Sequence, residues 1–365
     1  MKFVKTEDLK IGMRLAKPIY NNKGVLLYER DSELTTQGID SIKNFGLIGI
    51  YILEPAEPLP PMSQDDIDFE RFQTVSIFTI KDELNEILNH HKQKQSYQFA
   101  ETVLKAYGRL ERKINFVQNL RSSADFVYKH SLNVAMLCAL ISRKMNIRHE
   151  EQLETIIAGF VHDIGKLQAP EELIGTRELD EIAERELSHF EFGGISIVEQ
   201  AFYSAPNIKR IILQSYKQLE AFRNEKELEN MKLVNGARVL IVAETYDAMT
   251  AMCINGEPQS EIKTLKFLQS HPEVFDPEAV EALVKSIHFV SEGCSVELSN
   301  GQKALVLSAN EKDVLRPILL CFSNNMIMDL QQTMMFGDIE IVDIMKTMDN
   351  RYAMDLDAVK KVKEE

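Results

Sequence analysis

The chain has no tryptophan, and only four of its 365 residues are cysteines. These are Cys138, Cys253, Cys294 and Cys321, and none of them forms a Cys-x-x-Cys pair. Isolated cysteines argue against a disulfide framework and against a zinc knuckle, because both need thiols paired at short spacing. Cys138 lies in an apolar run, where a buried free thiol is expected.

Positive charge is also scarce. The chain has 42 lysines and arginines against 56 aspartates and glutamates, which gives a formal net charge of −14. A surface this acidic argues against binding of duplex nucleic acid, which needs cationic side chains on the phosphates. A small anionic ligand is still compatible with it, because one local cation or bound metal can reverse the sign of the field at a site.

Long apolar runs are absent as well. No stretch approaches the roughly 18 residues that a membrane span needs. The first residues, MKFVKTEDLKIGMRL, turn acidic too early for a signal peptide. With 44% apolar and 27% charged residues, the composition is typical of a globular protein, and we expect a cytoplasmic location.

A chain of 365 residues exceeds one ordinary core, so two or three domains are expected. Composition and periodicity predict a small β-rich N-terminal domain (1–53), a proline-rich linker (54–64) and connecting helices (65–121). A helical domain (122–292), a β-containing extension (293–348) and a charged tail (349–365) are expected to follow. Turns are expected at residues 21–24 (NNKG) and, as a two-residue hairpin loop, at residues 300 and 301 (NG). The predicted fold class is therefore mainly α. Domain order suggests a regulatory or dimerising role for the first domain, so a homodimer is a further expectation.

Polar residues interrupt three apolar helical segments. In LETIIAGFVHDIG, residues 153–165, His162 and Asp163 stand where apolar side chains surround almost the whole helix. His130 continues an apolar stripe of the segment HSLNVAMLCALIS, and Asp247 continues one of ARVLIVAETYDAMTAM. A lone inward histidine is more often a core residue, but four such residues from three segments favour a metal site. Imidazole and carboxylate ligands suit zinc, manganese, iron or nickel better than calcium.

These motifs resemble the HD phosphohydrolase superfamily, and most closely its HD-GYP family. The matching pieces are HSLNVA from His130, VHDIGKLQAPEEL from Val161, LSHFEFGG from Leu187, ARVLIVAETYDAMT from Ala237 and VELSNGQKALVLS from Val296. The resemblance spans roughly residues 120–322. It implies an all-helical HD core that binds two or three metal ions, commonly iron or manganese, and hydrolyses cyclic di-GMP.

The resemblance also implies roles for individual residues. The first metal would be held by two histidines and two aspartates, namely His130, His162, Asp163 and Asp247. Asp163 would bridge to a second metal and orient the attacking water, and His189 would be a ligand of that second metal, although by pattern alone it reads equally well as a surface residue. Lys166 would contact a substrate phosphate or the attacking hydroxide; its alternative role is a cation that complements a helix end.

One part of the family pattern is missing. Where the family has His-His-Glu followed by a Gly-Tyr-Pro loop, this chain has Ser215, Tyr216 and Lys217, and no Gly-Tyr-Pro occurs before Leu233. Serine and tyrosine are poor ligands for a divalent transition-metal ion that is also bound by imidazole, and the positive charge of a lysine repels a cation. We therefore expect one divalent ion, which would be iron, manganese or another transition metal. A second ion is expected only if the altered second metal site still binds one.

Three functions are compatible with this pattern. The chain could be a divergent phosphodiesterase for cyclic di-GMP, a phosphohydrolase for another small substrate, or an inactive signalling module that binds a nucleotide or a protein partner. The intact quartet favours an enzyme, and the altered residues 215–217 favour the inactive module.

Overall fold

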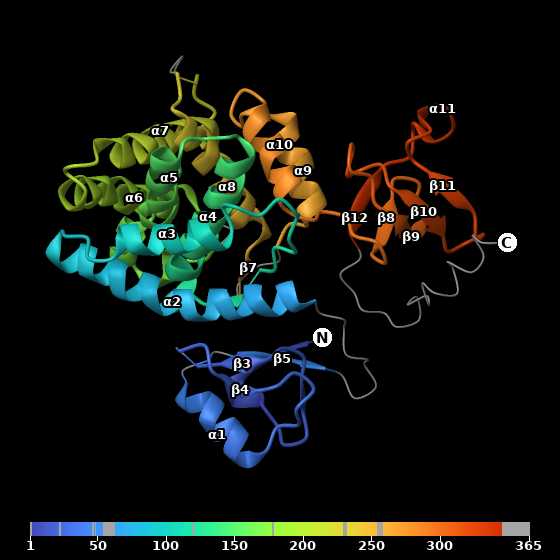
Figure 1. Ribbon diagram of the computed structural model, residues 1–365, viewed down its shortest axis with the longest axis horizontal. Coiled ribbons are helices and arrows are strands. Elements are labelled where there is room, and N and C mark those ends of the chain that lie inside the picture. Colours follow the sequence, from blue (N-terminus) through green and yellow to red (C-terminus); the bar gives the residue numbers. More distant parts are fainter. Residues whose placement is uncertain are drawn as a thin grey trace. The chain divides into compact units, whose positions relative to one another are not determined.

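The computed structural model describes residues 2–21, 23–45, 47, 49–53, 63–118, 120–176, 179–228, 232–253 and 258–344. The chain divides into two compact units, one that ends at Phe78 and one that begins at Thr79. It is mainly helical, with small sheets in its N-terminal and C-terminal parts, which confirms the predicted fold class (Figure 1). No described helix is both long and apolar enough to cross a membrane. The predicted tail at 349–365 and most of the predicted linker at 54–64 lie outside the described residues.

The first unit is rich in short strands. Its elements are β1 (Lys2–Lys5), η1 (Thr6–Asp8), β2 (Arg14–Leu15), β3 (Ile19–Tyr20), β4 (Leu26–Tyr28), α1 (Thr36–Asn44) and β5 (Gly49–Leu53). β5 lies between β1 and β2 in an antiparallel sheet, while β3 pairs with β4. Apolar side chains of α1 and the sheet, such as Ile42 and Ile52, form the core. In the predicted turn between β3 and β4, Gly24 has a φ of +73° and donates its N–H to Asn21.

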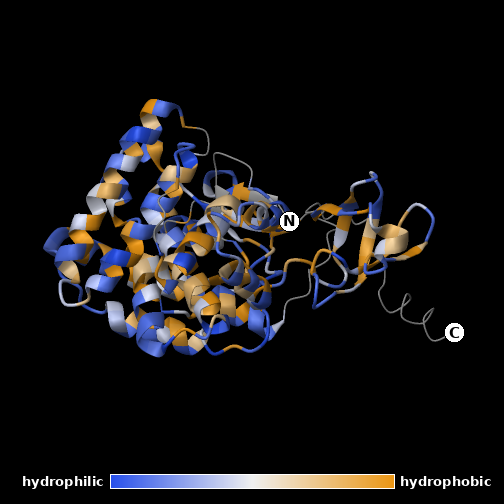
Figure 2. Ribbon diagram, turned by 90° about the horizontal axis from the view of Figure 1, so that it is seen from above, coloured by the Kyte–Doolittle hydropathy of each residue, from blue (hydrophilic) through white to orange (hydrophobic). Residues whose placement is uncertain are grey.

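Helix α2 (Gln64–His90) leads into the second unit, which is built mostly of helices. Its further elements are α3 (Ser96–Ala106), β6 (Leu120–Arg121), α4 (Ser123–Lys144), α5 (His149–Val161), η2 (Ile164–Gln168), η3 (Glu171–Leu173), α6 (Glu181–Ala201), α7 (Pro206–Arg223), α8 (Asn235–Thr250), β7 (Met252–Cys253), α9 (Glu261–Ser270) and α10 (Pro277–Ser286). Helix α4 packs against α3, α5, α8 and α10. Every side chain from His130 to Ser142 is consequently buried, polar ones included. The other helices mostly show one hydrophobic and one hydrophilic side (Figure 2).

The central pair of helices, α4 and α5, approaches closely at Gly159. A Cβ at this position would lie 3.0 Å from Sγ of Cys138 and 3.2 Å from Cα of Ala135, so the absence of a side chain permits the contact. The Cys138 thiol is free and buried, as the sequence predicts, and burial raises its pKa. Close packing of this pair fixes the last turn of α5, from which the candidate site projects.

The C-terminal part of the second unit is an antiparallel sheet. Its elements are β8 (Ser295–Leu298), β9 (Lys303–Ser308), β10 (Ile318–Cys321), β11 (Ile327–Asp329), α11 (Thr333–Phe336) and β12 (Ile341–Ile344), in the strand order β11-β10-β9-β8-β12. The predicted two-residue loop is wrong by one residue. Leu298 donates its N–H to Gln302, which leaves three residues in the loop. Gly301 takes the left-handed conformation, with φ of +76°, that such a three-residue loop requires at its last position.

Candidate metal centre

The site lies where α5 ends and the chain turns into η2. The regular part of α5 stops at Val161, His162 caps it, and Asp163 precedes η2. The turn packs directly onto α6 at Gly165, where a Cβ would lie only 1.9 Å from the carbonyl oxygen of Phe190. Glycine is therefore required there, and it brings the His-Asp pair between α4 and α6.

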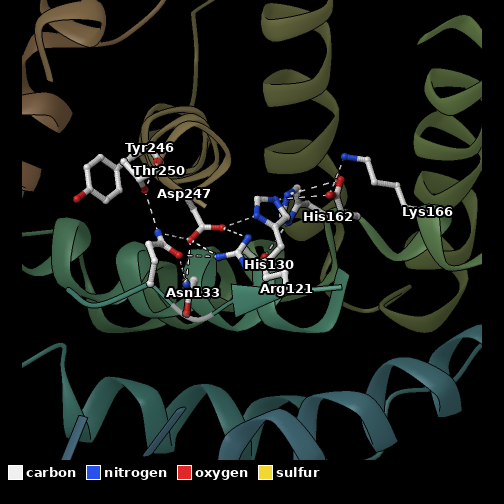
Figure 3. A network of polar contacts seen from close by, with 11 residues as sticks. Arg121, His130, Asn133, His162, Lys166, Tyr246, Asp247 and Thr250 are labelled. Carbon is white, nitrogen blue, oxygen red and sulfur yellow. Dashed lines mark hydrogen bonds and ion pairs between the residues drawn. The ribbon is translucent and has the colours of Figure 1, made fainter. Parts of the chain in front are cut away.

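Three of the predicted ligands meet in this place. Ligand atoms of His130, His162 and Asp163 all lie within 4.8 Å of one another, and all three residues are buried. Figure 3 shows His130 and His162 close together, with Asp247 beside His130. Nε2 of His130 is 3.5 Å from Oδ2 of Asp163, and Nε2 of His162 is 3.7 Å from Oδ1 of the same carboxylate. The group could hold one divalent metal ion.

The second nitrogen of each imidazole fixes its tautomer. Nδ1 of His162 donates to the carbonyl oxygen of Gly159 at 2.8 Å, and Nδ1 of His130 donates to Oδ2 of Asp247 at 2.6 Å. Because both acceptors can only accept, each neutral ring carries its lone pair on Nε2, next to Asp163. Nε2 of His162 is buried without a hydrogen-bond partner among the described residues. An orphaned buried lone pair beside a second one is what a metal ion would satisfy, so the residues fit the group.

Asp247 lies behind His130, outside the group of three. Its Oδ1 accepts hydrogen bonds from Arg121 at 2.7 Å, Asn133 at 2.9 Å and Gln118 at 3.0 Å. Its Oδ2 lies 2.7 Å from Nη1 of Arg121 in addition to the bond from His130. Burial would raise the pKa of this carboxyl, but the charge of Arg121 and the bond from His130 outweigh burial and lower it. This placement differs from the predicted direct ligation, because the core supplies Asp247 with other partners.

Sequence reasoning missed Arg121, Asn133 and Gln118. Arg121 lies in the two-residue strand β6, which pairs with β7, and its side chain is fully buried. The one available signal was indirect: a buried carboxylate that is not a metal ligand needs a counter-charge. Nothing in the pattern selects Arg121 as that partner, since it stands 126 residues before Asp247.

Lys166 forms two ion pairs beside the three ligands. Its Nζ is 2.8 Å from Oδ2 of Asp163 and 2.7 Å from Oε1 of Glu191, a buried residue of α6 that sequence reasoning also missed. Burial would raise the pKa of Asp163, but the charge of Lys166 and the hydrogen bond that it donates lower it. Burial works against the charge of Lys166, yet Asp163 and Glu191 raise its pKa. The lysine is thus a buried cation between two carboxylates, and not merely a helix-end charge.

The structure does not bring His189 into the group. Its side chain is exposed on α6, and it belongs to no cluster of potential ligands among the described residues. Ser215 is buried with its hydroxyl donating to Ile211, and Tyr216 donates to the carbonyl oxygen of Ser188 at 3.4 Å. A second metal at this position therefore stays a prediction.

A small cavity adjoins the site on the side of α7. Its walls include His162, Asp163, Glu191, Tyr216 and Arg223. The volume is about 20 Å³, which is room for one water molecule or one ion.

Comparisons with known proteins agree with this geometry. Residues 115–279 match a family described as the HD domain. A cyclic di-GMP phosphodiesterase of Pseudomonas aeruginosa, PA4108, is 22% identical over 207 residues, which cover 56% of this chain and 49% of the relative. A 3'3'-cGAMP-specific phosphodiesterase of Vibrio cholerae is 38% identical over 53 residues, or 14% of this chain and 12% of the relative. The chain thus matches half or less of the length of these curated relatives.

A solved structure is also similar. The protein Bd1817 of Bdellovibrio bacteriovorus, described as an HDG"Y"P protein, aligns over 77% of this chain and 97% of its own, at 14% identity and a TM-score of 0.46. The family match covers the whole stretch that carries His130, His162, Asp163 and Asp247. The part of the chain that carries these four residues is therefore similar to the HD domain, as its sequence motifs indicate.

Proposed function

We propose that this chain is a metal-dependent phosphohydrolase of the HD type and that its substrate is a cyclic dinucleotide such as cyclic di-GMP. The observation that carries the proposal is the pair of Nε2 lone pairs on His130 and His162, which meet beside the Asp163 carboxylate. The names of two relatives, each a phosphodiesterase for a cyclic dinucleotide, support the substrate class.

The residues present would hold one divalent ion through His130, His162 and Asp163. Such an ion would lower the pKa of water and polarise a phosphoryl oxygen. Asp163 would accept a hydrogen bond from the attacking water and so orient it. Lys166 would place a positive charge beside the phosphoryl group, where negative charge develops during the displacement. Asp247 would keep His130 in the tautomer that binds metal.

The alternative is an inactive signalling module that keeps the metal as a structural element. Two observations favour it: Ser215 and Tyr216 stand where the family has histidines, and the cavity beside the site holds about one water molecule. Under this alternative the site would bind metal but turn over no phosphodiester.

Metal analysis and a hydrolysis assay on the same preparations test the proposal. We expect the purified chain to carry a divalent metal and to hydrolyse cyclic di-GMP or 3'3'-cGAMP. Asp163→Asn should lower turnover by more than about 100-fold, because second-shell partners alone are worth 10–100-fold. Asp40→Asn, at an exposed position of α1, is the matched control and should change nothing. Metal without turnover would support the signalling module, and a chain that binds no metal would contradict both.

A further inference from the structure

We propose that this site holds a single metal ion, because the ammonium group of Lys166 takes the place of a second one between Asp163 and Glu191. The inference rests on the proposed function and specifies its metal content. It assigns Glu191 as the residue that positions Lys166.

The position of the ammonium group is the first argument. It lies 2.8 Å from one oxygen of Asp163 and 2.7 Å from one oxygen of Glu191, so it bridges the carboxylate that caps η2 and a carboxylate of α6. Asp163 is also the residue that the family resemblance makes the bridge to a second metal. A second ion that used the same Asp163 oxygen would have to displace Lys166.

The second argument is the charge around Glu191. Its other oxygen, Oε2, is buried without a hydrogen-bond partner among the described residues, and it faces Nη2 of Arg223 at 3.7 Å. Lys166 and Arg223 thus lie on either side of the same carboxylate. Like charges repel strongly at such distances in a partly buried site, so a divalent cation between them is disfavoured.

The third argument is the supply of ligands. Among the described residues, the only potential cluster of histidine, cysteine and carboxylate ligands is His130, His162 and Asp163, and Glu191 is not part of it. Serine and tyrosine line the α7 side of the cavity. Glu191 and Glu244, which also lines the cavity, are the remaining carboxylates there. They would become available to a cation only once the lysine charge is removed.

Manganese binding to the full-length chain tests the inference. Equilibrium dialysis gives the number of ions per chain, and electron paramagnetic resonance separates an isolated Mn²⁺ from a spin-coupled pair. We expect one isolated ion in the wild type. Lys166→Met removes the charge and keeps much of the length of the side chain, so a second, weaker ion should bind and couple to the first. Lys166→Arg should stay at one ion, and Lys92→Met, at an exposed lysine, is the matched control.

Each outcome decides the inference. A coupled pair in the wild type overturns it and leaves the proposed function intact. A folded Lys166→Met variant that still binds one ion overturns the role of the lysine. If this variant does not fold, Lys166→Gln tests the same point, because it also removes the charge and should raise manganese binding above one ion per chain. A wild type that binds no manganese overturns the inference and the proposed function together, whereas one isolated ion without hydrolysis removes only the proposed function.

Discussion

Arg121 contacts both oxygens of Asp247 in a fully buried ion pair. Its two terminal nitrogens lie 2.7 Å from Oδ1 and 2.7 Å from Oδ2, and neither side chain is exposed. The same carboxylate accepts a hydrogen bond from the Nδ1–H group of His130. The pair therefore connects the charge balance of the core to the orientation of a metal ligand, and its disruption should affect both.

Asp247→Asn tests this connection. The substitution leaves Arg121 buried without its counter-charge, which should reduce the free energy of unfolding by roughly 3–5 kcal/mol. It also removes the charged acceptor that fixes the tautomer of His130. Such changes to a partner of a metal ligand lower metal affinity about 10–100-fold. Chemical denaturation and metal titration measure the two effects. The double variant Arg121→Met, Asp247→Asn should regain stability but not metal affinity; recovery of both would contradict the orienting role of Asp247.

Gly165 and Gly193 give a matched pair of substitutions. A Cβ at Gly165 would meet the carbonyl oxygen of Phe190 at 1.9 Å, whereas a Cβ at Gly193, in the helix opposite, has no neighbour within 4 Å. Gly165→Ala should destabilise the protein by at least the ~1–3 kcal/mol typical of overpacking. It should also weaken metal binding, because η2 must shift away from α6. Gly193→Ala should stabilise α6 by up to about 1 kcal/mol. Thermal unfolding distinguishes them, and equal stability of the two variants would refute the close contact.

The environment of Asp276 predicts how the stability of the protein changes at low pH. It caps α10 by accepting from the N–H groups of Glu278 and Ala279, and it accepts a 2.7 Å hydrogen bond from Arg238. Partial burial would raise its pKa, but the bond from Arg238 and the two N–H groups lower it. A carboxyl with a lowered folded pKa stabilises the fold above its unfolded pKa of about 3.9, and this contribution is lost as the pH falls through the folded value.

Asp276→Asn should therefore reduce stability at pH 7 and have less effect near pH 2. An Asn side chain keeps the capping acceptor but loses the charge that Arg238 contacts, so the expected loss at neutral pH is about 1 kcal/mol or less. Urea denaturation at both pH values measures it. A loss that is constant across the pH range would show that the charge of Asp276 is irrelevant.

The sequence predicted site residues where a polar side chain interrupts the apolar periodicity of a helix. His130, His162 and Asp163 could be placed together because each interrupts an apolar stripe of a helix. The partners of Asp247 could not be predicted. Arg121 precedes helix α8, which carries Asp247, by a long stretch of chain, and the pairing of β6 with β7 brings the two residues together. Glu191 was hidden for a different reason: it stands among charged and aromatic residues of α6, where an exposed position is the ordinary expectation. The burial of Glu191 follows from the contact between two glycines, Gly165 and Gly194, which periodicity does not show.

Anomalous diffraction from crystals grown with Mn²⁺ tests the central claim most directly. The account predicts one anomalous peak within bonding distance of Nε2 of His130, Nε2 of His162 and an oxygen of Asp163, with Asp247 still paired to Arg121. A peak coordinated by Asp247 in place of this pairing, or no peak between the two imidazoles, would contradict it.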